Sequence, residues 1–328
     1  MIIDKKDLNE ALRRLAEGAC LFVPGEESGV RKFVRWSVGE IGPLCGNTEL
    51  PPKDILFPQT EKMYSFGTGT QTRVSEITEN EKQVVFGVRS CDMGSISRLD
   101  TVFLDMDFPD SFYARKRGNT TFIALACSQP DRTCFCDTMG LDPNASPAAD
   151  MLLIEACDCY GITAQSEKGS AVVELWDGLI KDGKADTVKA KCTLKTGMSD
   201  ALPEKLAVMF EHRIWEETSR ACIGCAVCTY VCPTCYCFDI GSVNHGYEGL
   251  AFRCWDSCMF SNYTRMAGGH NPRPTKKERI RNRYMHKLSY FFQRYGKTLC
   301  TGCGRCLEKC PAHIDITEFI DSAAEVEL

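Results

Sequence analysis

One cysteine phrase occurs twice near the C-terminus of this chain, and it constrains the fold more than any other feature. Each copy has three cysteines separated by two residues, then a fourth cysteine after three more residues, and each copy ends in proline. The copies are Cys222, Cys225, Cys228 and Cys232 before Pro233, and Cys300, Cys303, Cys306 and Cys310 before Pro311. Thiolates this close together surround one bound group, so the backbone of each copy must turn tightly, which the glycines inside the copies permit.

This spacing is the one at which cysteines bind [4Fe-4S] in proteins that hold two such clusters, and there the fourth cysteine of each phrase ligates the other cluster. We therefore expect cluster 1 on a first cysteine group and cluster 2 on a second. The first cysteine group is Cys222, Cys225, Cys228 and Cys310, and the second cysteine group is Cys300, Cys303, Cys306 and Cys232. Structural zinc is the alternative, but zinc sites use two separated cysteine pairs and do not require two complete phrases. The duplicated phrase thus predicts one-electron transfer.

The composition indicates a protein of a reducing compartment. The chain has 328 residues, enough for two domains with their own cores, and 21 cysteines. In a secreted chain these would indicate disulfides, but no signal peptide and no apolar stretch of membrane-spanning length are visible. We therefore expect a cytoplasmic protein with no membrane span. The net charge of −5 argues against a dedicated nucleic-acid-binding protein, although residues 270–283 are locally basic and suit a docking face or a solvated helix.

Hydrophobic patterning divides the chain at about residue 200. Residues 1–200 predict an α/β domain, with helices at 7–16, 93–99 and 111–117 and strands at 83–88, 120–126, 151–156 and 171–176. Residues 201–328 predict a mainly α-helical, ferredoxin-like domain with two [4Fe-4S] clusters. The reason is that helices are predicted at 202–218 and at 276–295, and the second of these lies in the long link between the phrases.

Further cysteines follow the predicted strands of the first domain. Cys91 comes shortly after strand 83–88, Cys127 directly follows strand 120–126, and Cys134 and Cys136 come soon afterwards. Ligand sites in open α/β sheets gather beyond the carboxyl ends of the strands. These four cysteines are therefore candidates for a third [4Fe-4S] cluster, and unpaired thiols that pack as small apolar side chains are the alternative.

The remaining cysteines and the usual cofactor motifs give weaker signals. Cys235, Cys237, Cys254 and Cys258 suit another metal site, a redox-active thiol pair or simple packing, and we favour packing. Five others belong to no recognisable pattern, namely Cys20, Cys45, Cys157, Cys159 and Cys192. Neither a G-x-G-x-x-G turn after a strand nor a phosphate-binding loop is present, so we expect that this chain alone binds no flavin or NAD.

Several phrases, spread over most of the chain, together resemble one family. They are residues 87–92, 134–136, 222–239, 255–258, 269–274 and 300–311. By these phrases the chain resembles the iron–sulfur β subunit of cytoplasmic sulfhydrogenases and the related iron–sulfur subunit of anaerobic sulfite reductase. Ser90 stands where family members usually carry proline.

The resemblance implies an electron-relay subunit with no catalytic residues of its own, and it strengthens the prediction of a third cluster. The implied partners are a flavin subunit that binds NAD(P) and a catalytic subunit such as a hydrogenase or a sulfite reductase. Two other interpretations stay open. One is a self-contained reductase that binds substrate at a cluster of the N-terminal domain, and the other is a metal-stabilised scaffold without a redox role.

Overall fold

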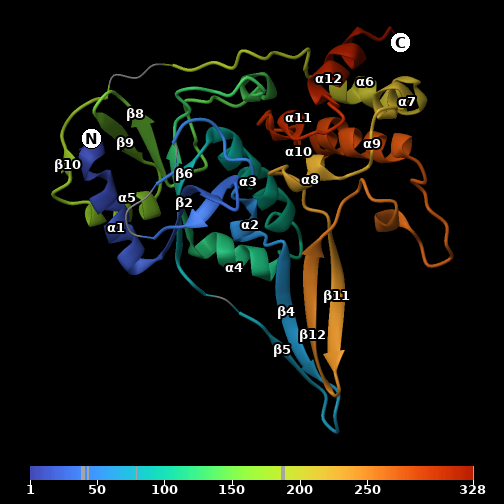
Figure 1. Ribbon diagram of the computed structural model, residues 1–328, viewed down its shortest axis with the longest axis horizontal. Helices are drawn as coiled ribbons and strands as arrows, with labels where there is room; N and C mark the ends of the chain where they lie inside the picture. The colour runs from blue at the N-terminus through green and yellow to red at the C-terminus, as the bar shows by residue number, and fades with distance from the viewer. Residues whose placement is uncertain (38–40, 43, 79, 186–188, 328) are drawn as a thin grey trace.

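The computed structural model describes residues 1–37, 41–42, 44–78, 80–185 and 189–327. A part with an eight-stranded sheet lies beside a part that carries both cysteine phrases, and a narrow four-stranded sheet projects away from both (Figure 1).

The eight-stranded sheet is the centre of the N-terminal part. Its strands are β1 (Ile2–Asp4), β2 (Cys20–Glu27), β3 (Val30–Arg35), β6 (Gln83–Val88), β7 (Thr120–Leu125), β8 (Met151–Glu155), β9 (Cys159–Ala164) and β10 (Ile180–Lys181). Their order is β10-β1-β9-β8-β7-β6-β2-β3, in which β8, β7, β6 and β2 run parallel and the strands on both edges are antiparallel. The strands predicted at 83–88, 120–126 and 151–156 are confirmed to within a residue.

Helices cover both faces of this sheet. They are α1 (Leu8–Gly18), α2 (Lys53–Leu56), α3 (Ser90–Phe103), α4 (Ser111–Asn119) and α5 (Glu167–Leu175), with the short turns η1 (Lys5–Asp7) and η2 (Cys136–Met139). Side chains alternate across a strand, so Val84 and Phe86 pack with α1 and α5 while Val85 packs with α2, α3 and α4. The strand predicted at 171–176 is wrong, because these residues belong to α5 and its end, and Ser166 caps the start of that helix.

The C-terminal part is built from helices around one core. They are α6 (Leu202–Val208), η3 (Met209–Glu211), α7 (Ile214–Ser219), α8 (Val227–Tyr230), η4 (Asn262–Thr264), α9 (Lys276–Met285), the π-helical turn η5 (His286–Tyr290), α10 (Phe291–Tyr295), α11 (Arg305–Glu308) and α12 (Ile316–Glu325). The helix predicted at 276–295 is confirmed as α9, η5 and α10 in succession. The helix predicted at 202–218 is interrupted, because His212 has extended backbone angles between η3 and α7. Within the described ranges, no helix is both long and apolar enough to cross a membrane.

The projecting sheet combines strands from both halves of the chain. Its strands are β4 (Thr60–Gly67), β5 (Arg73–Glu76), β11 (Phe238–His245) and β12 (Glu248–Trp255), and their antiparallel order is β11-β12-β4-β5. The hairpin β11–β12 lies between the two cysteine phrases in the sequence, so residues 201–328 are helices together with one long hairpin. Because β12 pairs with β4, this sheet crosses the predicted boundary at residue 200, and the domain division stays a prediction.

Candidate metal centres

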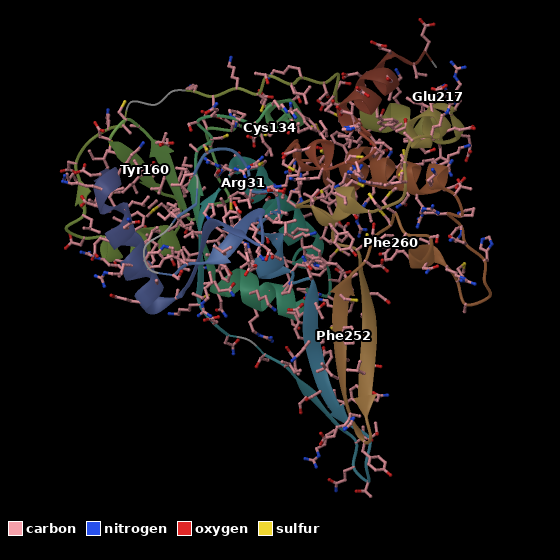
Figure 2. The ribbon with its side chains drawn as sticks, viewed as in Figure 1. Arg31, Cys134, Tyr160, Glu217, Phe252 and Phe260 are labelled. Carbon is pink, nitrogen blue, oxygen red and sulfur yellow. The ribbon has the colours of Figure 1, made fainter. Side chains whose placement is uncertain are left out.

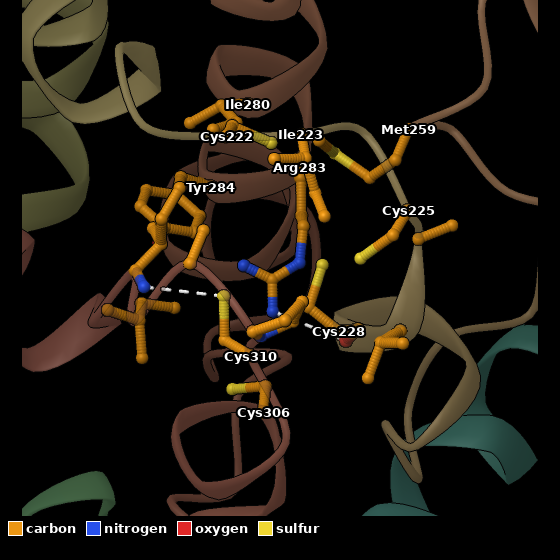
Figure 3. A pocket seen from close by; sticks show the side chains of 16 residues that line it. Cys222, Ile223, Cys225, Cys228, Met259, Ile280, Arg283, Tyr284, Cys306 and Cys310 are labelled. Carbon is orange, nitrogen blue, oxygen red and sulfur yellow. Dashed lines mark hydrogen bonds between the residues drawn. The ribbon is translucent and has the colours of Figure 1, made fainter.

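The first cysteine group lines a single pocket. Cys222 and Cys225 come from the loop that leads into α8, Cys228 lies in the first turn of α8, and Cys310 follows α11. Figure 3 shows these side chains around Arg283. The loop turns through positive φ angles at Gly224 and Ala226. Four thiols from two segments therefore face one space, which is the donor set that a [4Fe-4S] cluster requires.

Backbone N–H groups also point at sulfurs of this first group. The N–H of Ile314 donates to Cys310 Sγ at 3.3 Å, drawn as a dashed line in Figure 3, and the N–H of Gly224 donates to Cys222 Sγ at 3.4 Å. Such hydrogen bonds stabilise thiolates and anionic clusters. Among the described residues, no three His, Cys, Asp or Glu side chains converge as the ligands of a single metal ion would.

The second cysteine group is gathered around Cys232. Burial raises the pKa of Cys300, Cys303 and Cys306, and a nearby Cys232 thiolate raises all three further, to about 11 for Cys303 and about 12 for Cys306. The structure thus places Cys232 beside the second phrase and Cys310 beside the first. This is the arrangement that crossed ligation requires.

The two groups adjoin. Cys306 belongs to the second group but also lines the pocket of the first group. Arg283, on α9, lies between them: its Nη2 donates to the carbonyl of Cys228 at 3.4 Å, and its pKa is raised by the thiolates of Cys228 and Cys306 despite the opposing effect of burial. A cation at this position balances negative charge from both sites.

Lys287 on η5 contacts the second group directly. Its Nζ donates to Cys232 Sγ at 3.1 Å and to Thr234 Oγ1 at 3.0 Å, and the residue is 2% exposed. Burial alone would lower the pKa of Lys287, but the Cys232 and Cys235 thiolates raise it above its ordinary value. The sequence predicts the helix that carries Lys287 but gives no signal that its side chain reaches a sulfur.

A third cysteine group lies in the α/β part, and it differs from the predicted one. Four buried thiols pack together there, namely Cys91, Cys134, Cys136 and Cys192, and Cys136 Sγ lies 3.6 Å from Cys192 Sγ. We call these four the third cysteine group. Cys91 is in the first turn of α3, just beyond the carboxyl end of β6, as the sheet rule predicts. Cys134, labelled in Figure 2, lies on the side of the sheet that faces α11.

Cys127 is the predicted member that the structure leaves outside this buried group. It is only partly buried, and its N–H is held by the carbonyl of Pro143 at 2.9 Å. Cys192 is packed in the group instead. It lies on an irregular segment, and its own backbone N–H donates to Asp137 Oδ2 at 3.2 Å. Sequence reasoning misses Cys192 because it belongs to no spacing pattern and reaches the site on a segment without regular structure.

The third group is joined to the second by close backbone contact. The N–H of Phe135 donates to the carbonyl of Gly302 at 2.8 Å, and the Phe135 side chain, 1% exposed, inserts into the core of the helical part. A Cβ on Gly302 would lie 2.6 Å from backbone atoms of Phe135 and Cys136, and a Cβ on Gly304 would lie 2.5 Å from Thr133 O. Cys303 also packs against the third group. All three cysteine groups therefore form a contiguous series.

The four cysteines that follow the first phrase are divided among three places. Cys235 lies beside Cys232, and Cys237 lies beside Cys258 and the Tyr263 hydroxyl. Cys254 is opposite Asp239 on the projecting sheet, away from these thiols. The structure thus does not bring the four together as one ligand set.

Comparisons with known proteins agree with this chemistry. The family model described as "4Fe-4S dicluster domain" matches residues 221–314, the segment that contains both phrases. The chain is therefore an iron–sulfur protein with a 4Fe-4S dicluster domain in its C-terminal part. Sulfhydrogenase 2 subunit beta of Pyrococcus furiosus is 33% identical over 327 residues, which cover 96% of each chain. The chain belongs to the family of sulfhydrogenase beta subunits. No solved structure matches it.

Proposed function

We propose that this chain is the electron-relay subunit of a cytoplasmic, multi-subunit oxidoreductase. It passes electrons between a partner subunit that binds flavin and NAD(P) and a catalytic subunit, such as a hydrogenase or a sulfite reductase. It contributes no catalytic residues. Each [4Fe-4S] cluster supplies reversible uptake of one electron.

The observation that carries this proposal is the contiguity of the three cysteine groups. Cys306 borders the first group and Cys303 borders the third, so the second group lies in the middle of the series. A series of adjoining cluster sites suits electron transfer through the chain, whereas catalysis on a substrate needs only one cluster.

The proposal assigns the ligands as follows. Cluster 1 is held by the first cysteine group and cluster 2 by the second, in crossed ligation. A third [4Fe-4S] cluster is held in the α/β part, with Cys91, Cys134 and Cys136 as ligands and Cys192 in place of Cys127. Support for Cys192 is its burial with the other three thiols and its 3.6 Å contact with Cys136.

Anaerobic purification of the native complex tests the function. The expected result is co-purification with a flavoprotein and a catalytic subunit, and NAD(P)H should bleach the iron–sulfur absorbance of the complex but not of the isolated chain. Turnover of a substrate by the isolated chain, or bleaching of that chain by NAD(P)H alone, would contradict the relay.

One observation favours the second candidate, a self-contained reductase. An open cavity of about 760 Å³ lies beside the third group and is lined by Ser90, Arg98, Asp137 and Ser146, among others. Within the described ranges, Asp137 Oδ1 and Ser146 Oγ are buried without a hydrogen-bond partner. Convergent polar groups in the crevice of an α/β sheet suit a small substrate. The assay of the isolated chain distinguishes this candidate from the relay.

A further inference from the structure

We infer that Lys287 makes the two adjoining clusters unequal, by holding the reduction potential of cluster 2 above that of cluster 1. The inference rests on the proposed function, since it takes the first and second cysteine groups as the ligands of the two clusters. It also specifies where the electron is held: an electron that reaches this pair of clusters resides on cluster 2, the middle site of the series, and not on cluster 1.

The first step of the argument is the position of the ammonium. Lys287 Nζ lies 3.1 Å from the sulfur of Cys232, and its other described partner is the neutral hydroxyl of Thr234. Among the described residues, no carboxylate forms an ion pair with Lys287. A buried cation is costly unless an anion lies beside it. The anion available here is the sulfur ligand of cluster 2 and the cluster charge behind it.

The second step is how the chain holds this side chain in place. Lys287 lies in the π-helical turn η5, and such turns inside α-helices occur frequently at functional sites. The carbonyl of Lys287 accepts the N–H of Leu299 at 2.9 Å, which ties the turn to the start of the second phrase. The residue is therefore fixed to cluster 2 through both its backbone and its side chain.

The third step is the contrast with cluster 1. Cys310 is the crossing ligand there, as Cys232 is for cluster 2, but among the described residues its sulfur accepts only the neutral N–H of Ile314. Arg283 lines the pocket of the first group and also lies beside Cys306, but among the described residues its guanidinium donates to the carbonyl of Cys228 and to no cysteine sulfur. Lys276 donates to the carbonyl of Cys222, but it is an exposed residue, so solvent and salt screen its charge.

A second buried cation adds to the same asymmetry. Lys53 Nζ donates to the carbonyl of Cys235 at 2.8 Å and lies 3.6 Å from the centre of the Trp255 ring. It is 2% exposed and, within the described ranges, has no carboxylate in ion-pair contact. Its charge therefore also lies on the Cys232 side of the cluster pair.

Charge and hydrogen bonds to the sulfurs set the potential of an iron–sulfur cluster. Reduction adds one negative charge, and a nearby cation stabilises the reduced form more than the oxidised form. One electron enters cluster 2 from a neighbouring cluster and one electron leaves it, while Lys287 keeps its protons throughout. The step therefore balances without a proton donor.

The test is an anaerobic redox titration followed by electron paramagnetic resonance, on the wild-type chain and on Lys287→Gln. The amide of glutamine can still donate a hydrogen bond but has no charge. The signal of cluster 2 is identified as the one that Cys303→Ser alters. Lys287→Gln should lower the ratio of reduced to oxidised cluster 2 about tenfold at fixed potential, a shift of about 59 mV for a one-electron couple, and leave cluster 1 unchanged.

Lys205→Gln is the matched control, because Lys205 is in the same part of the chain and donates to the carbonyl of Ala324. It should leave both potentials unchanged. Two reducible clusters whose potentials do not respond to Lys287→Gln would overturn the inference and leave the relay standing. A wild-type chain without reducible clusters would instead overturn the proposed function.

A second measurement uses the wild-type protein, so it tests the inference even if the Lys287→Gln variant loses cluster 2. Wild-type protein labelled with ¹⁵N at lysine Nζ should show a ¹⁵N hyperfine coupling on the reduced signal of cluster 2 and none on that of cluster 1. Absence of the coupling from cluster 2 would overturn the inference.

Discussion

Arg305 forms a bidentate ion pair with Asp92 in the interior of the protein. The Nη1–Oδ1 and Nη2–Oδ2 distances are 2.6 and 3.0 Å, and the side chains are 2% and 1% exposed. Asp92 directly follows Cys91 of the third cysteine group, and Arg305 lies between Cys303 and Cys306 of the second. The pair thus connects the α/β part to the second cysteine phrase at the point where the two groups adjoin.

Asp92→Asn should destabilise the protein strongly. The substitution leaves the Arg305 guanidinium buried without its counter-ion, and breaking such a pair costs about 3–5 kcal/mol. Anaerobic thermal unfolding of the protein with its clusters measures this. Arg13→Gln is the control, since Arg13 pairs with Glu10 on the exposed face of α1, where solvent screens the pair, and it should leave the transition midpoint almost unchanged. Equal transition midpoints for the two variants would contradict the prediction.

Two glycines at the same position of the two phrases should respond differently to alanine. Gly224 and Gly302 both have positive φ, so alanine costs about 1–2 kcal/mol of backbone strain at either site. A Cβ on Gly224 meets nothing within 4 Å, but one on Gly302 overlaps the backbone of Phe135 and Cys136. Gly302→Ala should therefore cost about 1–3 kcal/mol more than Gly224→Ala.

Unfolding midpoints of the two glycine variants, with iron contents, check this prediction. The larger loss of stability in Gly302→Ala should be accompanied by loosening of the loop that carries Cys134 and Cys136. The prediction fails if Gly224→Ala is the more damaging change.

His286 should make stability fall with acid. Burial, and then the charge of Lys287, lower its pKa from 6.5 to about 4, while its Nε2 lies 2.9 Å from the Tyr236 hydroxyl. Above pH 6.5 both folded and unfolded forms are neutral. Below pH 6.5 the unfolded chain takes up a proton and the folded chain does not until about pH 4. The free energy of unfolding should therefore drop by ~2 kcal/mol between pH 7.5 and pH 5 through this residue.

His286→Asn keeps a hydrogen-bonding group near Tyr236 but cannot titrate in this range. Its unfolding midpoint relative to that of the wild type should rise as the pH is lowered from 7.5 to 5. A constant difference between the two proteins over that range would show that His286 does not carry the effect.

Removal of iron should unfold the helical part before the sheet. Lys287 and Arg283 are buried among the cysteines, and without anionic clusters their charges lose their partners. Binding of a metal group to a site that exists only in the folded state is itself folding free energy. Hydrogen exchange after anaerobic chelation should rise in α6–α12 while β6, β7 and β8 stay protected. Uniform protection across both parts would contradict this coupling.

The sequence can predict what local patterns determine. The buried runs that form β6, β7 and β8 are continuous and apolar, and the repeated phrase itself predicts that Cys232 and Cys310 are the crossing ligands. The hairpin β11–β12 escapes prediction because most of β11 is exposed and most of β12 is only partly buried, so the hairpin lacks a strong hydrophobic pattern. Residues 171–176 form the end of a helix because Val172 and Trp176 are one turn apart and both pack against α1 and the sheet.

Long-range features of the site lie beyond what the sequence can predict. Cys192 reaches the third group through a segment without regular structure, and the ion pair of Asp92 with Arg305 joins residues more than two hundred positions apart. Lys287 points to Cys232 only because η5 packs against the first phrase. The first and last of these contacts depend on packing within one part of the chain, and the Asp92–Arg305 pair depends on how the two parts dock; no local spacing encodes either.

The most direct test of the account is to quantify iron, sulfide and paramagnetic centres in chain purified without oxygen. We predict brown protein that gives electron paramagnetic resonance signals on reduction. It should contain about twelve iron atoms per chain, about eight in the two clusters of the duplicated phrase and about four in the third cluster. Colourless protein that contains zinc, with no signal on reduction, would contradict the account.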